Sequence, residues 1–373
     1  MSDQFIPVNT PLLGGNELEY VTDCIKTGWI SSEGSYVARF EEAVAEKVNR
    51  NFGIAVSNGT AAIDIAVAAL NIGEGDEVIM PTHTIISCIT QIIRAGAKPI
   101  FVDSDPLTWN MDVNQIEAKI TDRTKAIMAV HLYGLPAEMD TILGLAKKYH
   151  LKVIEDASQM LGQTYNGKPC GSFGDISTMS FYPNKQITTG EGGMCLTNDK
   201  ELEERCKSLR NLCFKPEKRF LHEELGWNYR MTNIQAAIGL AQVERLDYHI
   251  QRKREVGNKY LELLKDIPNI SLPVKSTDYA DNVYWIFGIL LEKGHRFNAT
   301  EVMKRLSEKG VGVRPFFYPL HKQPVFTNKG YFKGESYPNA DFMAENGFYI
   351  PSGLGITNEE MERVADIVNQ VLR

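Results

Sequence analysis

Short apolar runs alternate with segments of helical spacing from about residue 51 to residue 197, and this alternation limits the folds that the chain can adopt. The apolar runs are residues 52–56, 77–80, 99–102, 126–130, 153–155, 176–181 and 193–196. Helical spacing lies between them, for example at residues 61–70, 85–95 and 139–149. Strands that alternate with helices indicate a doubly wound, mostly parallel sheet with helices on both faces. The chain is therefore predicted to be an α/β protein.

A second, smaller unit is expected after this sheet, because 373 residues exceed what one hydrophobic core usually supports. A long helical stretch at residues 233–264 is interpreted as the connector. Beyond it, strands are predicted at residues 284–291 and 311–316, and helices at residues 299–309 and 359–372. We therefore expect a large domain over residues 1–245 and a small C-terminal α/β domain over residues 246–373.

Composition and charge argue against several classes of function. The formal net charge is −7 and the basic residues are scattered, so no basic surface for nucleic acid is expected. Residues 1–13 lack the pattern of a signal peptide, and no apolar run approaches membrane-spanning length. The six cysteines show no paired metal-ligand spacing and are expected to be reduced and mostly buried. We expect a cytoplasmic protein without a metal, a membrane partner or a nucleic-acid partner.

The turn at residues 57–62 follows the first predicted strand. Ligands of open α/β sheets collect at the carboxyl ends of the strands. The turn reads Ser-Asn-Gly-Thr-Ala-Ala, which places glycine and small residues at the start of a helix, where free amides can hold a phosphate. An ordinary helix cap by Ser57 or Thr60 explains these residues equally well. The turn is neither a Walker loop nor the GxGxxG fingerprint.

A carboxylate follows the fifth predicted strand. Asp156 stands where a buried carboxylate can keep a pyridine nitrogen protonated, which strengthens the ring as an electron sink. A lone aspartate after a strand more often caps the next helix. Gln159 follows one helical turn later and can reach the same ligand.

Lys185 lies in a segment rich in threonine and glycine, shortly after an apolar strand. Desolvation lowers the pKa of a lysine and makes its neutral amine available for a Schiff base with an aldehyde cofactor. A solvated loop lysine is the alternative. Gly190, Gly192 and Gly193 favour the ligand site, because glycines permit close backbone approach to a ligand. Ser180 precedes the lysine by five residues and can donate its hydroxyl to a phosphate.

These motifs together resemble a fold-type I pyridoxal-phosphate enzyme, and more narrowly the DegT/DnrJ/EryC1/StrS family of nucleotide-sugar aminotransferases. The motifs are Glu155-Asp156-Ala157-Ser158-Gln159, Gly174-Asp175, Ser180-Phe181, Lys185, Thr188-Thr189-Gly190-Glu191-Gly192-Gly193 and Asn228-Tyr229-Arg230-Met231. Residues 28–32 and 314–321 extend the resemblance over nearly the whole chain. The resemblance implies an aspartate-aminotransferase-like fold and a homodimer with shared active sites, to which residues 1–35 contribute.

The resemblance also implies a role for each matching residue. Lys185 forms the Schiff base with pyridoxal 5′-phosphate and then shuttles protons. The other cofactor contacts would be Asp156 at the ring nitrogen, Gln159 at the ring hydroxyl, Thr60, Ala61 and Ser180 at the phosphate, and the partner's Asn228. The sugar pocket would be lined by Trp29, Ser31, Tyr318 and His321.

One position departs from the family pattern. The family usually stacks an aromatic ring on the cofactor, and the expected position holds Ile85, with His83 nearby. An aliphatic side chain can still fill the ring face by dispersion.

The activity implied is a ping-pong transamination, in which L-glutamate leaves as 2-oxoglutarate and a nucleotide-linked keto sugar receives the amino group. Among subgroups, the chain looks most like those that act on GDP-4-keto-6-deoxymannose for O-antigen or another surface polysaccharide. UDP- or dTDP-linked 4-keto or 3-keto sugars and keto sugar acids are alternative substrates. A cofactor-binding regulator without turnover is a further alternative, and a Rossmann oxidoreductase is disfavoured because GxGxxG is missing.

Overall fold

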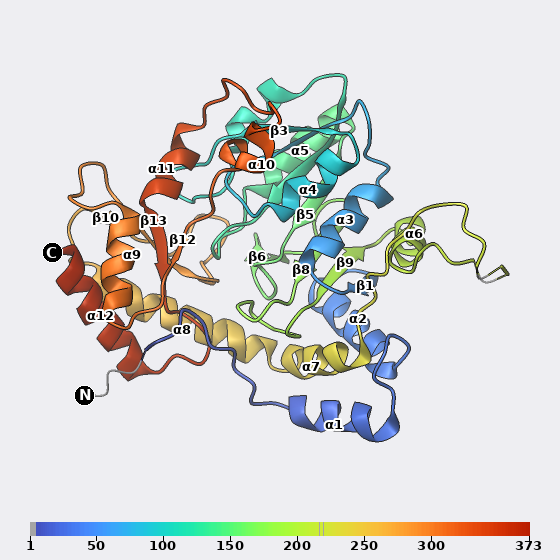
Figure 1. Ribbon diagram of the computed structural model, residues 1–373, viewed down its shortest axis with the longest axis horizontal. Helices are drawn as coiled ribbons and strands as arrows, with labels where there is room; N and C mark the ends of the chain where they lie inside the picture. The colour runs from blue at the N-terminus through green and yellow to red at the C-terminus, as the bar shows by residue number, and fades with distance from the viewer. Residues whose placement is uncertain (1–4, 216, 219) are drawn as a thin grey trace.

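The computed structural model describes residues 5–215, 217–218 and 220–373, arranged around a seven-stranded sheet (Figure 1). The strands are β1 (Phe52–Val56), β2 (Glu77–Pro81), β3 (Lys98–Val102), β4 (Thr124–Val130), β5 (Lys152–Asp156), β8 (Ile176–Ser180) and β9 (Gly193–Thr197). Their order is β1-β9-β8-β5-β4-β2-β3. Strand β9 runs antiparallel to β1 and β8, and the other pairings are parallel. The predicted α/β class is confirmed.

Helices cover both faces of this sheet, because successive side chains of each strand point into opposite cores. One core contains side chains of α3 (Gly59–Ala69), α4 (Ser87–Arg94) and α6 (Lys200–Arg210), and the other those of α2 (Ser35–Lys47), α5 (Met139–Tyr149) and α7 (Asn233–Val243). In β1, Ile54 belongs to the first core and the next residue, Ala55, to the second. Burial on both faces explains why the strands read as continuous apolar runs.

A second sheet of four antiparallel strands forms the C-terminal part. In spatial order its strands are β10 (Ile270–Ser271), β11 (Phe287–Leu291), β13 (Gly347–Ile350) and β12 (Arg314–Pro315). They share a third core with α8 (Leu246–Leu264), α9 (Ala299–Glu308) and α12 (Asn358–Leu372). Helix α8 follows α7 along the underside of the molecule and leads from one sheet to the other (Figure 1).

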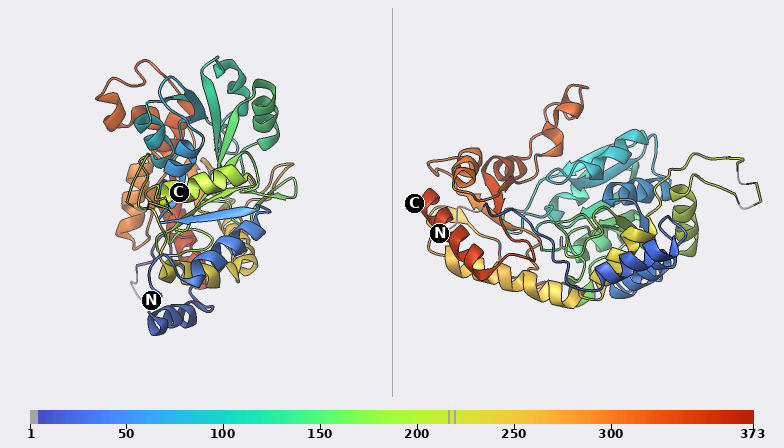
Figure 2. Two further views of the ribbon diagram at one scale, coloured as in Figure 1. Left: turned by 90° about the vertical axis from the view of Figure 1, so that its right-hand side faces the viewer. Right: turned by 60° about the horizontal axis from the view of Figure 1, so that its bottom comes forward.

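The remaining elements include α1 (Glu17–Thr27), which packs against α7, and a separate sheet of two short strands, β6 (Thr164–Tyr165) and β7 (Lys168–Pro169). The others are the 3-10 helices Val113–Gln115, Glu117–Lys119 and Leu320–Lys322, and the helices α10 (Pro324–Thr327) and α11 (Pro338–Asn346). The segment between α6 and α7 extends away from the rest of the molecule (Figure 2). Within the described residues, no helix is both long and apolar enough to cross a bilayer.

Three predicted elements differ from the structure. The single helical stretch at residues 233–264 is two helices, since α7 ends at Val243 and α8 begins at Leu246. The strand predicted at residues 284–291 begins at Phe287, because Tyr284 adopts a left-handed backbone with a φ of 48°. The strand predicted at residues 311–316 is reduced to Arg314–Pro315, and Val311 forms only an isolated bridge with Ile6.

Candidate functional site

The carboxyl ends of β5 and β8 and the start of α3 enclose a cavity of about 640 Å³, here called the Lys185 cavity. Seven of the predicted site residues line it: Thr60, Ala61, Ile85, Asp156, Gln159, Ser180 and Lys185. They come from four separate parts of the chain. Most of the predicted cofactor residues therefore lie together, as expected for side chains at the carboxyl ends of neighbouring strands.

The start of α3 forms one wall of this cavity. Asn58 caps the helix, because its side-chain oxygen accepts the amide of Ala61 at 2.8 Å, so the predicted caps Ser57 and Thr60 were wrong. The amides of Gly59 and Thr60 lie in the first helical turn, where no intrahelical carbonyl can pair with them. A Cβ at Gly59 would lie 2.7 Å from the Cβ of Ser180, so glycine is needed for this approach. The helix start and the serine hydroxyl together suit an anion.

Asp156 is 3% exposed and ends β5 at the cavity wall. Its Oδ1 accepts the amide of Ser158 at 3.0 Å, and its Oδ2 accepts the thiol of Cys88 at 3.3 Å. Burial raises the pKa of the Cys88 thiol well above its usual range, so the thiol stays protonated and keeps donating. The carboxylate is thus held from two sides and retains lone pairs for a cationic ligand.

Gln159 and Ile85 complete the wall around Asp156. The Gln159 Oε1 accepts the amide of Tyr133 at 2.6 Å, which leaves the side-chain NH₂ group to donate. Ile85 is 42% exposed and lines the cavity. His83 is fully buried with its Nε2 at 3.1 Å from the Tyr133 hydroxyl, and burial lowers its pKa to about 3. Ile85, not His83, therefore forms the cavity surface.

Lys185 also lines this cavity. Burial lowers the pKa of Lys185 to about 8, and the negative charge of Asp156 acts in the opposite direction. Its Nζ lies 4.0 Å from the ring centre of Trp285. A lysine whose neutral form is accessible near neutral pH can react with an aldehyde or exchange protons.

Two of the glycines after Lys185 are required by the packing of the chain itself. A Cβ at Gly193 would lie 2.4 Å from the carbonyl oxygen of Asn58, and one at Gly192 would lie 2.1 Å from Oγ1 of Thr189. These glycines therefore permit close approach of the chain to itself. Gly193 lets the chain approach the start of α3, and the interpretation that these glycines allow close approach to a ligand stays a prediction.

Several residues that line the Lys185 cavity were given no role by the sequence analysis. Trp285, Phe317 and Tyr349 line the Lys185 cavity from the C-terminal part of the chain. Tyr229 lines it as well and donates its hydroxyl to Asp64 at 3.0 Å. Tyr229 and Phe317 lie within motifs of the resemblance but were given no role, whereas Trp285 and Tyr349 lie outside those motifs and are identified only by the folded chain.

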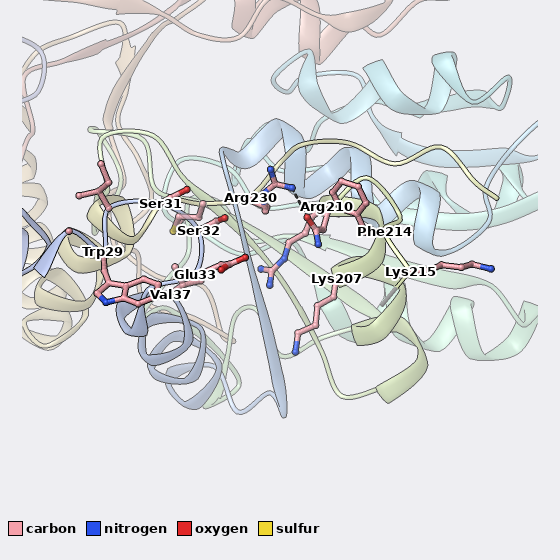
Figure 3. Close-up of a pocket in the computed structure, with 14 residues that line it drawn as sticks. Trp29, Ser31, Ser32, Glu33, Val37, Lys207, Arg210, Phe214, Lys215 and Arg230 are labelled. Atoms are coloured by element: carbon pink, nitrogen blue, oxygen red, sulfur yellow. Dashed lines mark hydrogen bonds between the residues drawn. The ribbon is translucent and has the colours of Figure 1, made fainter. Parts of the chain in front are cut away.

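The remaining predicted residues lie elsewhere. Trp29 and Ser31 line a second cavity of about 850 Å³, here called the Trp29 cavity, together with Arg210 and Arg230 (Figure 3). Asn228 pairs through its backbone with Asn211, which lines the same cavity. A single copy of the chain therefore keeps these predicted contacts apart from Lys185.

Tyr318 and His321, both predicted to contact the sugar, do not line the Lys185 cavity. Tyr318 is 53% exposed. His321 is buried, with Nδ1 at 2.8 Å from Oγ1 of Thr82 and Nε2 at 3.3 Å from Asp341. His321 can reach a ligand only if this arrangement opens.

Among the residues that the structure describes, His131, Glu155 and Cys170 place metal-ligand atoms close together. The Nδ1 of His131 accepts the amide of Ala137 at 3.0 Å, so its Nε2 carries the proton and donates to Glu155 at 3.0 Å. The imidazole has no lone pair left for a metal, and this cluster is structural.

Comparison with known proteins places this geometry in context. The model of the DegT/DnrJ/EryC1/StrS aminotransferase family matches residues 11–369. The GDP-perosamine synthase of Escherichia coli O157:H7 is 43% identical over 98% of both chains, and that of Caulobacter vibrioides is 41% identical over the same shares. The solved structure of an aminotransferase from Psychrobacter cryohalolentis has a TM-score of 0.89 and 29% identity, and covers 98% of both chains.

Proposed function

Because the chain belongs to the DegT/DnrJ/EryC1/StrS aminotransferase family, we propose that it transfers the amino group of L-glutamate to carbon 4 of GDP-4-keto-6-deoxymannose. The product would be GDP-perosamine, for O-antigen or another surface polysaccharide. The chain is a sugar aminotransferase, and its cofactor is pyridoxal 5′-phosphate. The GDP-linked substrate is supported by the two relatives that are more than 40% identical over almost their full length.

The observation that carries this proposal is the composition of the Lys185 cavity, which fits each group of the cofactor. The start of α3 at Gly59 and Thr60, with Ser180, suits the phosphate. The Ala61 amide, also predicted to hold the phosphate, donates to Asn58 instead. Asp156 suits the protonated ring nitrogen, and the free NH₂ group of Gln159 suits the ring hydroxyl. When bound, the cofactor supplies an electron sink for the carbon that loses its proton.

Lys185 is the proposed carrier of that proton. Only the neutral amine accepts a proton, and a pKa of about 8 leaves about one-tenth of the amine neutral at pH 7. An amine without burial would be almost entirely charged at this pH. Burial therefore prepares Lys185 as a base, and the ammonium that forms can return the proton as an acid.

A homodimer with shared active sites is part of the proposal. Trp29, Ser31 and Asn228 lie at or beside the Trp29 cavity rather than the Lys185 cavity. Leu18 is 81% exposed and Ile25 is 64% exposed on α1, close in sequence to Trp29. Apolar side chains this exposed favour a protein interface. We propose that a second copy covers them and that the Trp29 cavity then faces the partner's Lys185 cavity.

The basic residues of the Trp29 cavity suit the diphosphate of a nucleotide sugar. Arg210 and Arg230 both line this cavity (Figure 3), and Arg210 also pairs with Glu41. Within the shared site, Trp29, Ser31, Tyr318 and His321 remain the proposed sugar contacts. We also propose the cytoplasm as the location, because all six cysteines are free and buried, as suits a reducing compartment.

The test follows the visible absorbance of the purified protein loaded with pyridoxal 5′-phosphate. L-glutamate should bleach the yellow band, and GDP-4-keto-6-deoxymannose should restore it. UDP- and dTDP-linked 4-keto sugars, a 3-keto sugar and a keto sugar acid are compared at equal concentration. Faster recovery with one of these would replace the GDP-linked substrate. A band that is indifferent to glutamate would contradict the proposed donor and favour the regulator without turnover.

A further inference from the structure

Trp285 contacts the catalytic lysine from a part of the chain that no motif marks. The Lys185 Nζ lies 4.0 Å from the centre of its ring. Its indole Nε1–H donates to the backbone oxygen of Asn184, the residue before the lysine, at 2.8 Å. We propose that Trp285 is a positioning residue for Lys185, whose ring face orients the amine and stabilises its protonated form. The inference rests on the proposed role of Lys185 as the proton carrier.

The indole is held in place from several sides. Trp285 is 5% exposed, and its ring lies parallel to that of Tyr133, with centres 6.3 Å apart and an interplanar angle of 3°. Its backbone oxygen accepts the amine of Lys253 on α8 at 2.8 Å. Lys253 also donates to the backbone oxygen of Ser352 at 2.7 Å. The backbone of Trp285 is thus joined through Lys253 to α8 and to the segment that follows β13.

The ring and the burial of Lys185 act in opposite directions on the lysine. Removal from water favours the neutral amine. The face of a tryptophan attracts a cation more strongly than that of any other aromatic side chain, and most strongly where water is excluded. A group that must accept and then return a proton works best when both of its forms are accessible near the working pH. Trp285 supplies the attraction that keeps the ammonium form accessible.

The test measures the amine directly, independently of turnover. The protein is loaded with pyridoxamine 5′-phosphate, which leaves the Lys185 amine free. Acetylation of Lys185 by acetic anhydride is then followed across pH by mass spectrometry of the peptide that contains it. The midpoint of the pH profile is compared rather than the rate, because a wider cavity raises the rate at every pH.

Four variants give the comparison. Trp285→Leu and Trp285→Met remove the ring face, so the midpoint should fall by about one pH unit, with about fivefold more neutral amine at pH 7. Trp285→Phe keeps a weaker face and should shift the midpoint less. Phe317→Leu is the matched control. It removes a ring that lines the same cavity and stacks on Tyr133 but is not the ring that Lys185 faces. Its midpoint should equal that of the wild-type protein.

Equal midpoints in the wild-type, Trp285→Leu and Trp285→Met proteins would overturn the proposal. An equal fall in Phe317→Leu would also overturn it, because any loss of aromatic surface would then suffice. If Trp285→Leu does not fold, Trp285→Met supplies the same comparison with a longer side chain. Failure of the proposed function shows separately, as absence of a glutamate-driven absorbance change in the wild-type protein.

Discussion

The thiol of Cys88 donates a hydrogen bond to Oδ2 of Asp156 across 3.3 Å. Both side chains are buried, and they come from different elements, Cys88 from α4 and Asp156 from the end of β5. Since Ser158 holds the other carboxylate oxygen, the orientation of the carboxylate is set before any ligand binds. A carboxylate held in this way meets the ring nitrogen of the cofactor with little reorganisation.

Cys88→Ala should weaken binding of pyridoxal 5′-phosphate about fivefold, because loss of one hydrogen bond to the carboxylate costs about 1 kcal/mol. Cys88→Ser keeps a donor and should bind the cofactor close to the wild-type affinity. Cofactor titrations followed by absorbance give the dissociation constants. Cys170→Ala, which truncates a buried thiol in the other core, is the control and should leave the affinity unchanged. An unchanged affinity in Cys88→Ala would show that Ser158 alone holds Asp156.

The half-reaction with the keto sugar should depend on pH through Lys185. The amine is free at the start of this half-reaction and must be neutral to accept a proton. With a pKa of about 8, the single-turnover rate should rise about tenfold per pH unit below pH 8 and level off above it. Rapid-mixing absorbance from pH 6 to pH 9 measures this profile. Lys185→Ala should lose at least about 10²-fold in rate together with the pH dependence.

Much of the fold and cofactor site could be predicted, because both follow from local patterns. Strands buried on both faces read as apolar runs, and side chains at their carboxyl ends converge without long-range information. Asp156 and Lys185 were found in this way, and both line one cavity. The short strands β10, β12 and β13 were missed or misplaced in extent, because two to four residues carry too little periodicity to detect.

The rest of the site could not be read from sequence, because it depends on contacts between distant segments. Trp285 precedes β11 and reaches Lys185 only once α8 and the second sheet are packed. One packing role of the glycine-rich segment was missed for a related reason. Gly193 accommodates the backbone of Asn58, which is about 135 residues away in the chain.

Lys253 should make stability depend on pH. Burial lowers its folded-state pKa to about 7, whereas an unfolded lysine keeps its usual value of 10.5. Between these values the unfolded chain binds the extra proton, so the free energy of unfolding contributed by this group rises from pH 7 towards pH 10.5. Below pH 7 the buried Lys253 amine is charged, and the full cost of burying this charge lowers the free energy of unfolding. Lys253→Met should remove this dependence, and Tm values of both proteins from pH 6 to pH 10 test it.

The wild-type and Lys253→Met proteins are compared by how their Tm values change with pH, not by the Tm at a single pH. Methionine also loses the hydrogen bonds to Trp285 and Ser352, which lowers Tm at every pH. The difference between wild-type and variant Tm should therefore widen in favour of the wild-type protein as pH rises. A constant difference would contradict the lowered pKa. Lys265→Met, a substitution at an exposed lysine, controls for the loss of one charge.

Two inactive variants should restore each other if active sites are shared between subunits. Lys185→Ala removes the proton carrier, and Asn228→Asp places a negative charge where the proposed dimer brings the cofactor phosphate of the partner subunit. A mixed dimer then has one site with both changes and one site with neither. Random exchange of equal amounts gives half mixed dimers, so about one-quarter of the wild-type activity should appear. Activity is measured after the two proteins are mixed, unfolded and refolded together. Each variant refolded alone is the control, and a mixture no more active than the controls would show that Asn228 serves the site of its own subunit.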